Sequence, residues 1–364
     1  MEVLSATAIT VNPRKLSITV TLGTQVGIFT PNHEEFVSDA KAEENEQLNT
    51  LIIPVNNRIV SAICEKKVNI SEEIRITSGI SDEDCIINTS VEWCTEDIKA
   101  LTNRVMLRGT AIARIVTMSK DGETLAHNSY NLPFSQILES DTIDARDELD
   151  VSYQTTDCVM RLVARAEGGI FLQCDISAGI FCVATRTVPI NILTDIYSIT
   201  YDVAYETKDI NTVDACENQT VNVPISCVIN PDFGAVRIQH HRECCQMQAC
   251  DDVLRGKIFC TVVYENVGGK LCTRCCVMEA EAPKCEGRVT LKVEDMKLDI
   301  TDTGDINISG NAIFAISTEH RCSNKQISAC RINKDRAKLR DKGSSLVLRN
   351  IGEHESIWSI AKQY

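Results

Sequence analysis

Apolar and polar residues alternate along most of this 364-residue chain. Successive side chains of a β-strand point to opposite faces, so alternation with a period of two predicts strands that are buried on one side. Many short strands of this kind favour an all-β fold built from antiparallel sandwich-like or barrel-like modules. The alternation covers residues 16–22, 50–55, 159–166, 171–176, 197–205, 235–239, 258–264 and 306–317.

Glycine-containing turns separate predicted strands at two equivalent places, Asp121-Gly122 and Gly268-Gly269. Both dipeptides favour two-residue hairpins, because their residues accept a positive φ. Helical patterning is rare by comparison. The best helical window is residues 34–48.

The chain contains an internal repeat. Leu107-Arg108-Gly109 recurs as Leu254-Arg255-Gly256, at an offset of 147 residues. Several matches in one order and at nearly one spacing indicate a duplication. They predict two tandem β-rich modules, residues 1–140 and 151–322, joined by the acidic stretch 141–150. Two earlier matches share an offset of 152 residues: Gly27-Ile28-Phe29 with Gly179-Ile180-Phe181, and Cys64-Glu65 with Cys216-Glu217.

The C-terminal part differs in kind. Residues 330–345 are highly charged and lack strand periodicity, so we expect a charged linker at residues 323–345. Residues 346–364 resemble the N-terminal half of a LysM module, with a strand at 346–349, a turn, and a first helix at 360–364. A whole LysM has a second helix and a closing strand, whereas this sequence stops at Tyr364. We therefore expect a truncated module.

The LysM resemblance implies a set of docking residues on the turn and at the start of the helix. Ser356 in addition suits the helix N-cap by residue type. The implied docking residues are Gly352, Glu353, Ser356, Ile357 and Trp358.

The whole arrangement resembles the SPOCS-domain proteins of spore-forming Firmicutes, in which tandem β-rich modules precede a C-terminal LysM. Residues 107–115 and 254–264 carry the core of the SPOCS motif, and Leu132-Pro133-Phe134 carries its end in the first module. The second module has Ala282-Pro283 at that place, which is a weaker match. The resemblance implies a sporulation role in spore coat assembly.

Charge and composition exclude several kinds of partner. The formal net charge is −14 and aromatic residues make up only 5% of the chain. Such a surface repels phosphate backbones and offers few stacking platforms, so we expect no nucleic-acid partner. The sequence has no classical signal peptide and no apolar run approaching the roughly 20 residues of a membrane-spanning helix. We therefore expect no membrane insertion and synthesis in a cytoplasm.

Catalytic chemistry leaves no signature in the sequence. We find none of the common nucleophile, phosphate-loop, dinucleotide or zinc-protease motifs, and predict that the chain is not an enzyme. One dense group of metal-ligand types stands out, but Cys272 and Cys275 would point to opposite faces of a strand, and the first module lacks the corresponding cysteines. We assign no metal and no cofactor. The group comprises His240, His241, Glu243, Cys244 and Cys245, with Cys250, Cys272 and Cys275 nearby.

Eighteen cysteines are many for a cytoplasmic chain. Cys174, Cys182 and Cys260 lie within apolar alternation and are predicted to be core thiols. A second set lies among polar residues near a predicted hairpin. We expect this set to cross-link once the mother cell lyses and the thiols meet an oxidising environment. The cross-linking set is Cys244, Cys245, Cys272, Cys275 and Cys276.

These features predict a structural or interaction protein of the endospore envelope, which acts in coat assembly or anchoring. The resemblance implies residence in the mother-cell cytoplasm and then in the coat, with spore coat or coat-basement proteins as partners. Peptidoglycan and a second copy of the chain are further candidate partners. The alternative is a vegetative cell-wall protein that binds peptidoglycan through a complete LysM. A third hypothesis is a metal- or redox-dependent enzyme, which predicts bound metal or loss of activity on Cys244→Ser.

Overall fold

The computed structural model describes residues 2–23, 28, 30, 33–43, 47–77, 79–165, 168–249, 252–285, 287–337, 350–352 and 355–363. The fold is all-β, as the alternation predicts. All strand pairs are antiparallel, and the described residues contain a single short helix, α1 (Ile357–Gln363). The strands are β1 (Glu2–Asn12), β2 (Lys15–Gly23), β3 (Leu48–Ile76), β4 (Cys85–Leu101), β5 (Arg104–Met118), β6 (Leu125–Glu139), β7 (Glu148–Ala164), β8 (Ile170–Ser198), β9 (Tyr201–Ile229), β10 (Ala235–Ala249), β11 (Val253–Asn266), β12 (Leu271–Pro283), β13 (Arg288–Ile300) and β14 (Ile306–Ala337).

Two six-stranded units of the same topology follow one another. In the first unit, the sheet β3-β8-β7 faces the sheet β4-β5-β6. In the second, the sheet β9-β14-β13 faces the sheet β10-β11-β12. Each strand of one unit therefore has a counterpart in the other, six strands later. The repeated Leu-Arg-Gly segments lie on β5 and β11, which are the third strands of their units.

The boundaries of the units differ from those that the sequence predicts. β7 and β8 pair with each other, and β8 pairs with β3, so both belong to the first unit. The units therefore span residues 48–198 and 201–337 instead of 1–140 and 151–322. The acidic stretch 141–150 is not a connection between units. It is the turn from β6 to β7, where Ile143 is buried and the buried carboxylate of Asp147 pairs with Arg186 at 3.0 Å. The units are joined at Ile199-Thr200.

One of the matches that suggested the repeat is not a structural equivalence. Residues 179–181 lie on β8, the last strand of the first unit, so their counterpart is on β14 and not near residue 27. Gly27 and Phe29 lie outside the described residues. Cys64 and Cys216, by contrast, lie on the first strands of the two units, β3 and β9.

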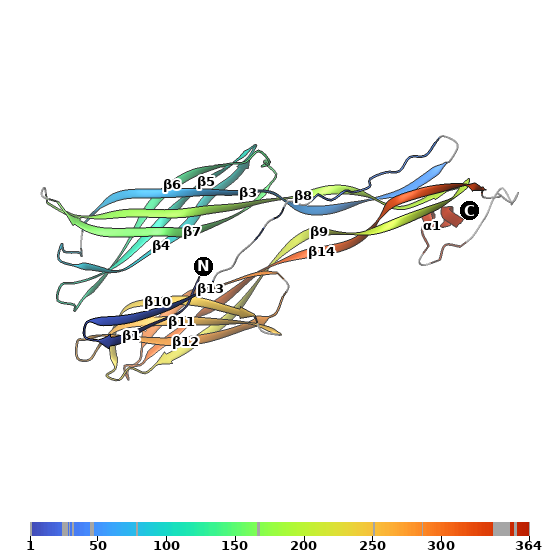
Figure 1. The fold of residues 1–364 in the computed structure, drawn as a ribbon. Coiled ribbons are helices and arrows are strands. Elements are labelled where there is room, and N and C mark those ends of the chain that lie inside the picture. Colours follow the sequence, from blue (N-terminus) through green and yellow to red (C-terminus); the bar gives the residue numbers. More distant parts are fainter. Residues whose placement is uncertain are drawn as a thin grey trace.

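Four strands are much longer than the sandwiches need. β3, β8 and β9 have 29 residues each and β14 has 32. Only part of each strand covers a sandwich. Figure 1 shows the rest of these strands leaving the two sandwiches and running on together to the end where α1 lies. We call this projection the arm. It consists of the parts of these four strands that lie outside the two cores, before Ala62 on β3, after Ala184 on β8, before Val221 on β9 and after Ile316 on β14.

The predicted helix at residues 34–48 does not form. Described residues 33–43 run irregularly, and β3 already begins at Leu48. Val37 and Ala40 instead pack on a small core of Leu193, Ile196 and Ile327 at the arm. The backbone of Val37 is held in this extended path, since its carbonyl accepts from the Leu193 N–H at 2.8 Å and its N–H donates to Gln326 at 3.3 Å.

The predicted charged linker is in large part strand. β14 continues to Ala337 and pairs with β9 down to Tyr201, and the rest of the predicted linker lies outside the described residues. The predicted strand 346–349 lies outside the described residues. In the described part of the chain, α1 with its seven residues is too short to cross a membrane.

Both predicted hairpins exist, with longer loops than two residues. β5 and β6 are joined by residues 119–124, and β11 and β12 by residues 267–270. Gly122 and Gly269 take a positive φ, of 75° and 72°. Glycine therefore enables each turn, as expected, although only one residue per loop needs it.

Candidate functional site

The helix α1 begins with the predicted N-cap. The Ser356 hydroxyl accepts from the Ser359 N–H at 3.1 Å, and the Ser359 hydroxyl accepts from the Ser356 N–H at 2.9 Å. This reciprocal pair is a capping box with serine in both roles, and it satisfies two backbone donors that the helix itself leaves free.

The same helix docks against the arm through its aromatic and basic side chains. The Trp358 Nε1–H donates to Asp195 Oδ2 at 2.8 Å, and the Trp358 ring meets the Tyr197 ring edge-on, with centroids 4.9 Å apart. Lys362 donates to Asp195 Oδ1 at 2.6 Å and lies over the Tyr205 ring at 5.3 Å. A single carboxylate on β8 thus accepts from both Trp358 and Lys362, and Lys362 also donates to the Tyr205 hydroxyl on β9 at 3.4 Å.

The contacts of α1 favour the ionised form of Asp195. Partial burial opposes its ionisation, but the hydrogen bonds from Lys362 and Trp358 outweigh burial and hold the pKa of Asp195 below its usual value. The same ion pair raises the pKa of Lys362 against the opposing effect of desolvation. Both groups therefore stay charged at neutral pH when the helix is docked.

The LysM-like docking residues are thus only partly presented to solvent. Ile357 is exposed, whereas Trp358 is half-buried against the arm. Gly352 is exposed and its N–H donates to Glu355 Oε2 at 3.0 Å. Glu353 lies outside the described residues. In the described structure, the Trp358 side chain contacts β8 of the same chain.

The three predicted core thiols are buried, which confirms that prediction. Cys174, Cys182 and Cys260 are completely inaccessible. Burial raises the pKa of each of these thiols to about 11, because a thiolate is poorly solvated among apolar side chains. Such cysteines are inert at neutral pH.

The five predicted cross-linking cysteines divide between two faces of the sheet β10-β11-β12. Cys245, Cys272 and Cys276 pack against the core of the second unit, whereas Cys244 and Cys275 are exposed. Burial, together with a hydrogen bond to Cys227 from the facing sheet, raises the pKa of Cys276. Only Cys244 and Cys275 therefore have both exposure and freedom from core packing.

These two exposed thiols cannot bond to each other. Cys244 is on β10 and Cys275 on β12, with β11 between them. Two strand spacings amount to about 9.5 Å, whereas a disulfide needs Cα atoms within about 6.8 Å. A disulfide at either position would have to reach another partner.

The described members of the predicted metal-ligand group near residue 240 do not converge on one point, and Cys250 lies outside the described residues. Cys272 and Cys275 lie opposite Tyr264 and Thr261 on β11 and so face opposite sides of the sheet, as argued from the sequence. His240 lies instead against His127 of the first unit, with ring centroids 4.9 Å apart. Its Nε2 is buried and has no hydrogen-bond partner among the described residues.

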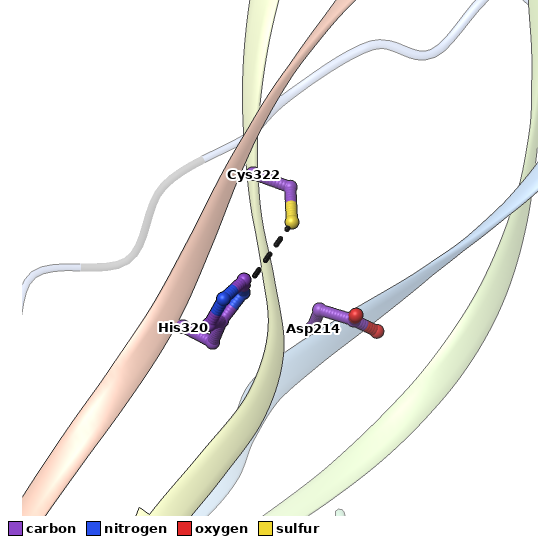
Figure 2. A group of neighbouring side chains, drawn as sticks. All are labelled: Asp214, His320 and Cys322. Carbon is purple, nitrogen blue, oxygen red and sulfur yellow. Dashed lines mark hydrogen bonds between the residues drawn. The ribbon is translucent and has the colours of Figure 1, made fainter.

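A different group of metal-ligand types does converge, where the arm leaves the second sandwich. It consists of Asp214 on β9 and of His320 and Cys322 on β14 (Figure 2). One ligand atom from each side chain lies within 4.8 Å of the other two, and Cys322 Sγ is 3.7 Å from His320 Nδ1. Sequence reasoning missed this group. The signal was the His-x-Cys spacing, which places both side chains on one face of a strand.

A cleft between the two units is lined by ion pairs. Arg58 contacts Glu148 at 2.6 Å, and Arg288 of the second unit contacts Asp150 of the first at 3.0 Å. The Arg58–Glu148 pair lies within the first unit, and only the exposed pair of Arg288 and Asp150 links the two units.

Comparison with known proteins identified no relative of this chain. No protein-family model matches the chain, and no match was found among curated proteins or among solved structures. The resemblance to SPOCS-domain and LysM proteins therefore stays a prediction from the sequence.

Proposed function

We propose that this chain is a non-enzymatic structural protein of the endospore envelope, which serves in coat assembly or anchoring. The observation that carries the proposal is the repeated six-stranded unit, with a Leu-Arg-Gly segment on the third strand of each copy. The motif that resembles SPOCS domains thus occupies the same position in two copies of one topology.

Exposed strand edges support an assembly role. β4, β6, β10 and β12 have 13 to 17 residues and, among the described residues, each pairs on one side only. An edge of this kind offers a row of backbone donors and acceptors that another chain can extend by strand addition.

The hairpin β1-β2 supports the same role. It forms a two-stranded sheet of its own, and such hairpins are marginally stable alone. Leu16, Ile18 and Val20 alternate on one face of β2 and are 48–65% exposed. An exposed apolar row on a small sheet is typical of a surface that binds another protein.

The test is localisation. A fluorescent fusion expressed in a sporulating Firmicute is expected to concentrate around the forespore. A uniform cytoplasmic signal throughout sporulation would contradict the proposal. The matched comparison is Trp358→Ala, which removes the aromatic side chain of the LysM-like tail and leaves both sandwiches intact, and so separates recruitment by the tail from recruitment by the β units.

Peptidoglycan pull-down distinguishes a coat-assembly protein from the alternative, a vegetative cell-wall protein. A vegetative wall protein should sediment with purified peptidoglycan, and Trp358→Ala should abolish sedimentation. A coat-assembly protein should be recruited through other proteins, so that its localisation is lost when a coat partner is removed.

A further inference from the structure

A backbone irregularity lies at the root of the arm, next to the cluster of Asp214, His320 and Cys322. Along β14, His320 pairs with Ala215 of β9, but the next residue, Arg321, pairs with Val213. Asp214 is therefore the extra residue of a β-bulge. Bulges re-aim side chains and are frequent beside functional sites.

The bulge is held in place by a contact from the first unit. The Val213 N–H donates to Asn57 Oδ1 of β3 at 3.1 Å. This hydrogen bond ties the residue next to the bulge to β3. Asp214 is exposed, and so is His320, while Cys322 is half-buried.

The donor atoms nearly have the spacing of a tetrahedral metal site. Zinc binds sulfur at about 2.3 Å and nitrogen or oxygen at about 2.0–2.2 Å, so its ligands lie roughly 3.3–3.8 Å apart. Cys322 Sγ and His320 Nδ1 already meet this, at 3.7 Å. Asp214 lies within 4.8 Å of both, and a change of about 1 Å at an exposed side chain needs no movement of the strands.

We propose that Asp214, His320 and Cys322 bind one zinc ion. A thiolate with an imidazole favours zinc over magnesium or calcium, which prefer all-oxygen sites. On binding, the Cys322 thiol loses its proton to solvent and its sulfur forms the bond to the metal. Three protein ligands leave one position of the tetrahedron for water, and the exposure of Asp214 and His320 leaves that position open to solvent.

The ion would join β9 to β14 where the bulge interrupts their ladder. This is just beyond the sandwich, whose core ends at Val221 on β9 and Ile316 on β14. Zinc at this point would fix the direction in which the arm leaves the second unit. Zinc binding at this point is independent of the proposed function, because it requires only three side chains and one bulge.

Cobalt(II) is a suitable probe, since it takes zinc sites and absorbs in the near ultraviolet when a thiolate binds it. We expect the reduced full-length chain to bind one equivalent of Co²⁺ with this thiolate band, and Zn²⁺ to displace it. Cys322→Ser should abolish the band. Asp214→Asn should lower the affinity for Co²⁺ at least about 10-fold, because a change in a group that only hydrogen-bonds a metal ligand already costs about 10–100-fold.

Cys330→Ser is the matched control, because Cys330 is an exposed thiol on the same strand outside the cluster. It should keep the stoichiometry and the band of the parent chain. Circular dichroism of each variant verifies the fold, and Asp214→Asn supplies a conservative second variant. A thiolate band of full intensity in Cys322→Ser, or no Co²⁺ binding by the parent chain, would overturn the proposal.

Discussion

Two glycines show how single residues control packing in the two sandwiches. A Cβ on Gly109 would collide with the carbonyl oxygen of Cys94 and lie 2.8 Å from the Phe134 ring. A Cβ on Gly256 would lie 2.6 Å from a terminal methyl of Leu291 and 3.2 Å from the Phe314 ring. In both units, the glycine of the Leu-Arg-Gly segment leaves room for an aromatic ring, which explains a glycine in the interior of a strand.

These contacts predict unequal costs for the same substitution. Gly109→Ala meets backbone, which cannot move without disturbing the sheet, and should lower the free energy of unfolding by about 1–3 kcal/mol. Gly256→Ala meets the end of a flexible side chain and should cost less. Thermal or urea unfolding of the two variants measures the difference. An equal or larger loss for Gly256→Ala would contradict this account of the packing.

The thiols should also differ residue by residue in reactivity. A thiol with a pKa of about 11 is ionised to roughly one part in a thousand at about pH 8, and Cys174, Cys182 and Cys260 are in addition inaccessible. Maleimide labelling of the folded chain, read by mass spectrometry, should therefore modify Cys244 and Cys275 and leave those three unmodified until denaturant is added. Early labelling of Cys260 would show that the core of the second unit opens.

At the scale of elements, docking and pairing decide which segments become regular. Residues 34–43 have a helix-like pattern, yet hydrogen bonds to Leu193 and Gln326 hold them extended against the arm. The opposite happens at α1, which has only seven residues. Isolated helices of this length are unstable in water, so its capping box and its contacts with Asp195 and Tyr197 stabilise it.

This dependence predicts the effect of Asp195→Asn on the helix. The variant loses the ion pair with Lys362, so α1 should leave the arm. The emission of Trp358 should then shift to longer wavelength, as measured in a Trp93→Phe background. Asp202→Asn, at an exposed position on β9, is the control. An unchanged spectrum in Asp195→Asn would mean that the aromatic contact alone holds the helix.

The same contact should depend on acid. Docking of α1 lowers the pKa of Asp195. Protonation of Asp195 therefore favours the undocked form. Docking is fully stabilised above the ordinary Asp pKa of about 3.9 and is lost as the pH falls below it. The Trp358 signal should follow that transition, and in Asp195→Asn this acid transition should be absent.

At the scale of the whole molecule, two sandwiches of one topology contact each other through a histidine pair and an ion pair. His127 of β6 stacks on His240 of β10, and Arg288 of β13 pairs with Asp150 of β7. The second contact is an exposed ion pair and contributes little. His240 is more buried than either side chain of this ion pair, and we expect it to make the contact between the units depend on pH.

Acidification should weaken the contact between the units. Burial, and next the neighbouring His127, His241 and Arg242, lower the pKa of His240, with Glu243 opposing them. A lowered pKa means that the contact favours the neutral ring, so its stabilisation is complete above about pH 6.5 and is lost as the pH falls below it. Thermal unfolding between about pH 7.5 and about pH 5 should show this loss.

His240→Gln should reduce that dependence, because glutamine carries no charge at any pH in the range. His33→Gln, at an exposed site of an irregular segment, should leave it unchanged. Equal pH profiles for the parent chain and His240→Gln would exclude this histidine as the cause.

The sequence by itself determined the all-β class, several strands of each sandwich, the existence of a repeat, the core thiols and the Ser356 cap. All of these depend on neighbours close in sequence, on the period of two, or on residue type. The predicted strand 197–205 is wrong, since the junction of the two units at Ile199-Thr200 interrupts it. Only the tertiary structure decided the unit boundaries, since they follow from β8 pairing with β3 across more than a hundred residues. It likewise decided the docking of Trp358 and the convergence of Asp214 on His320 and Cys322, because long-range pairing and a one-residue bulge set these contacts and neither has a local signal.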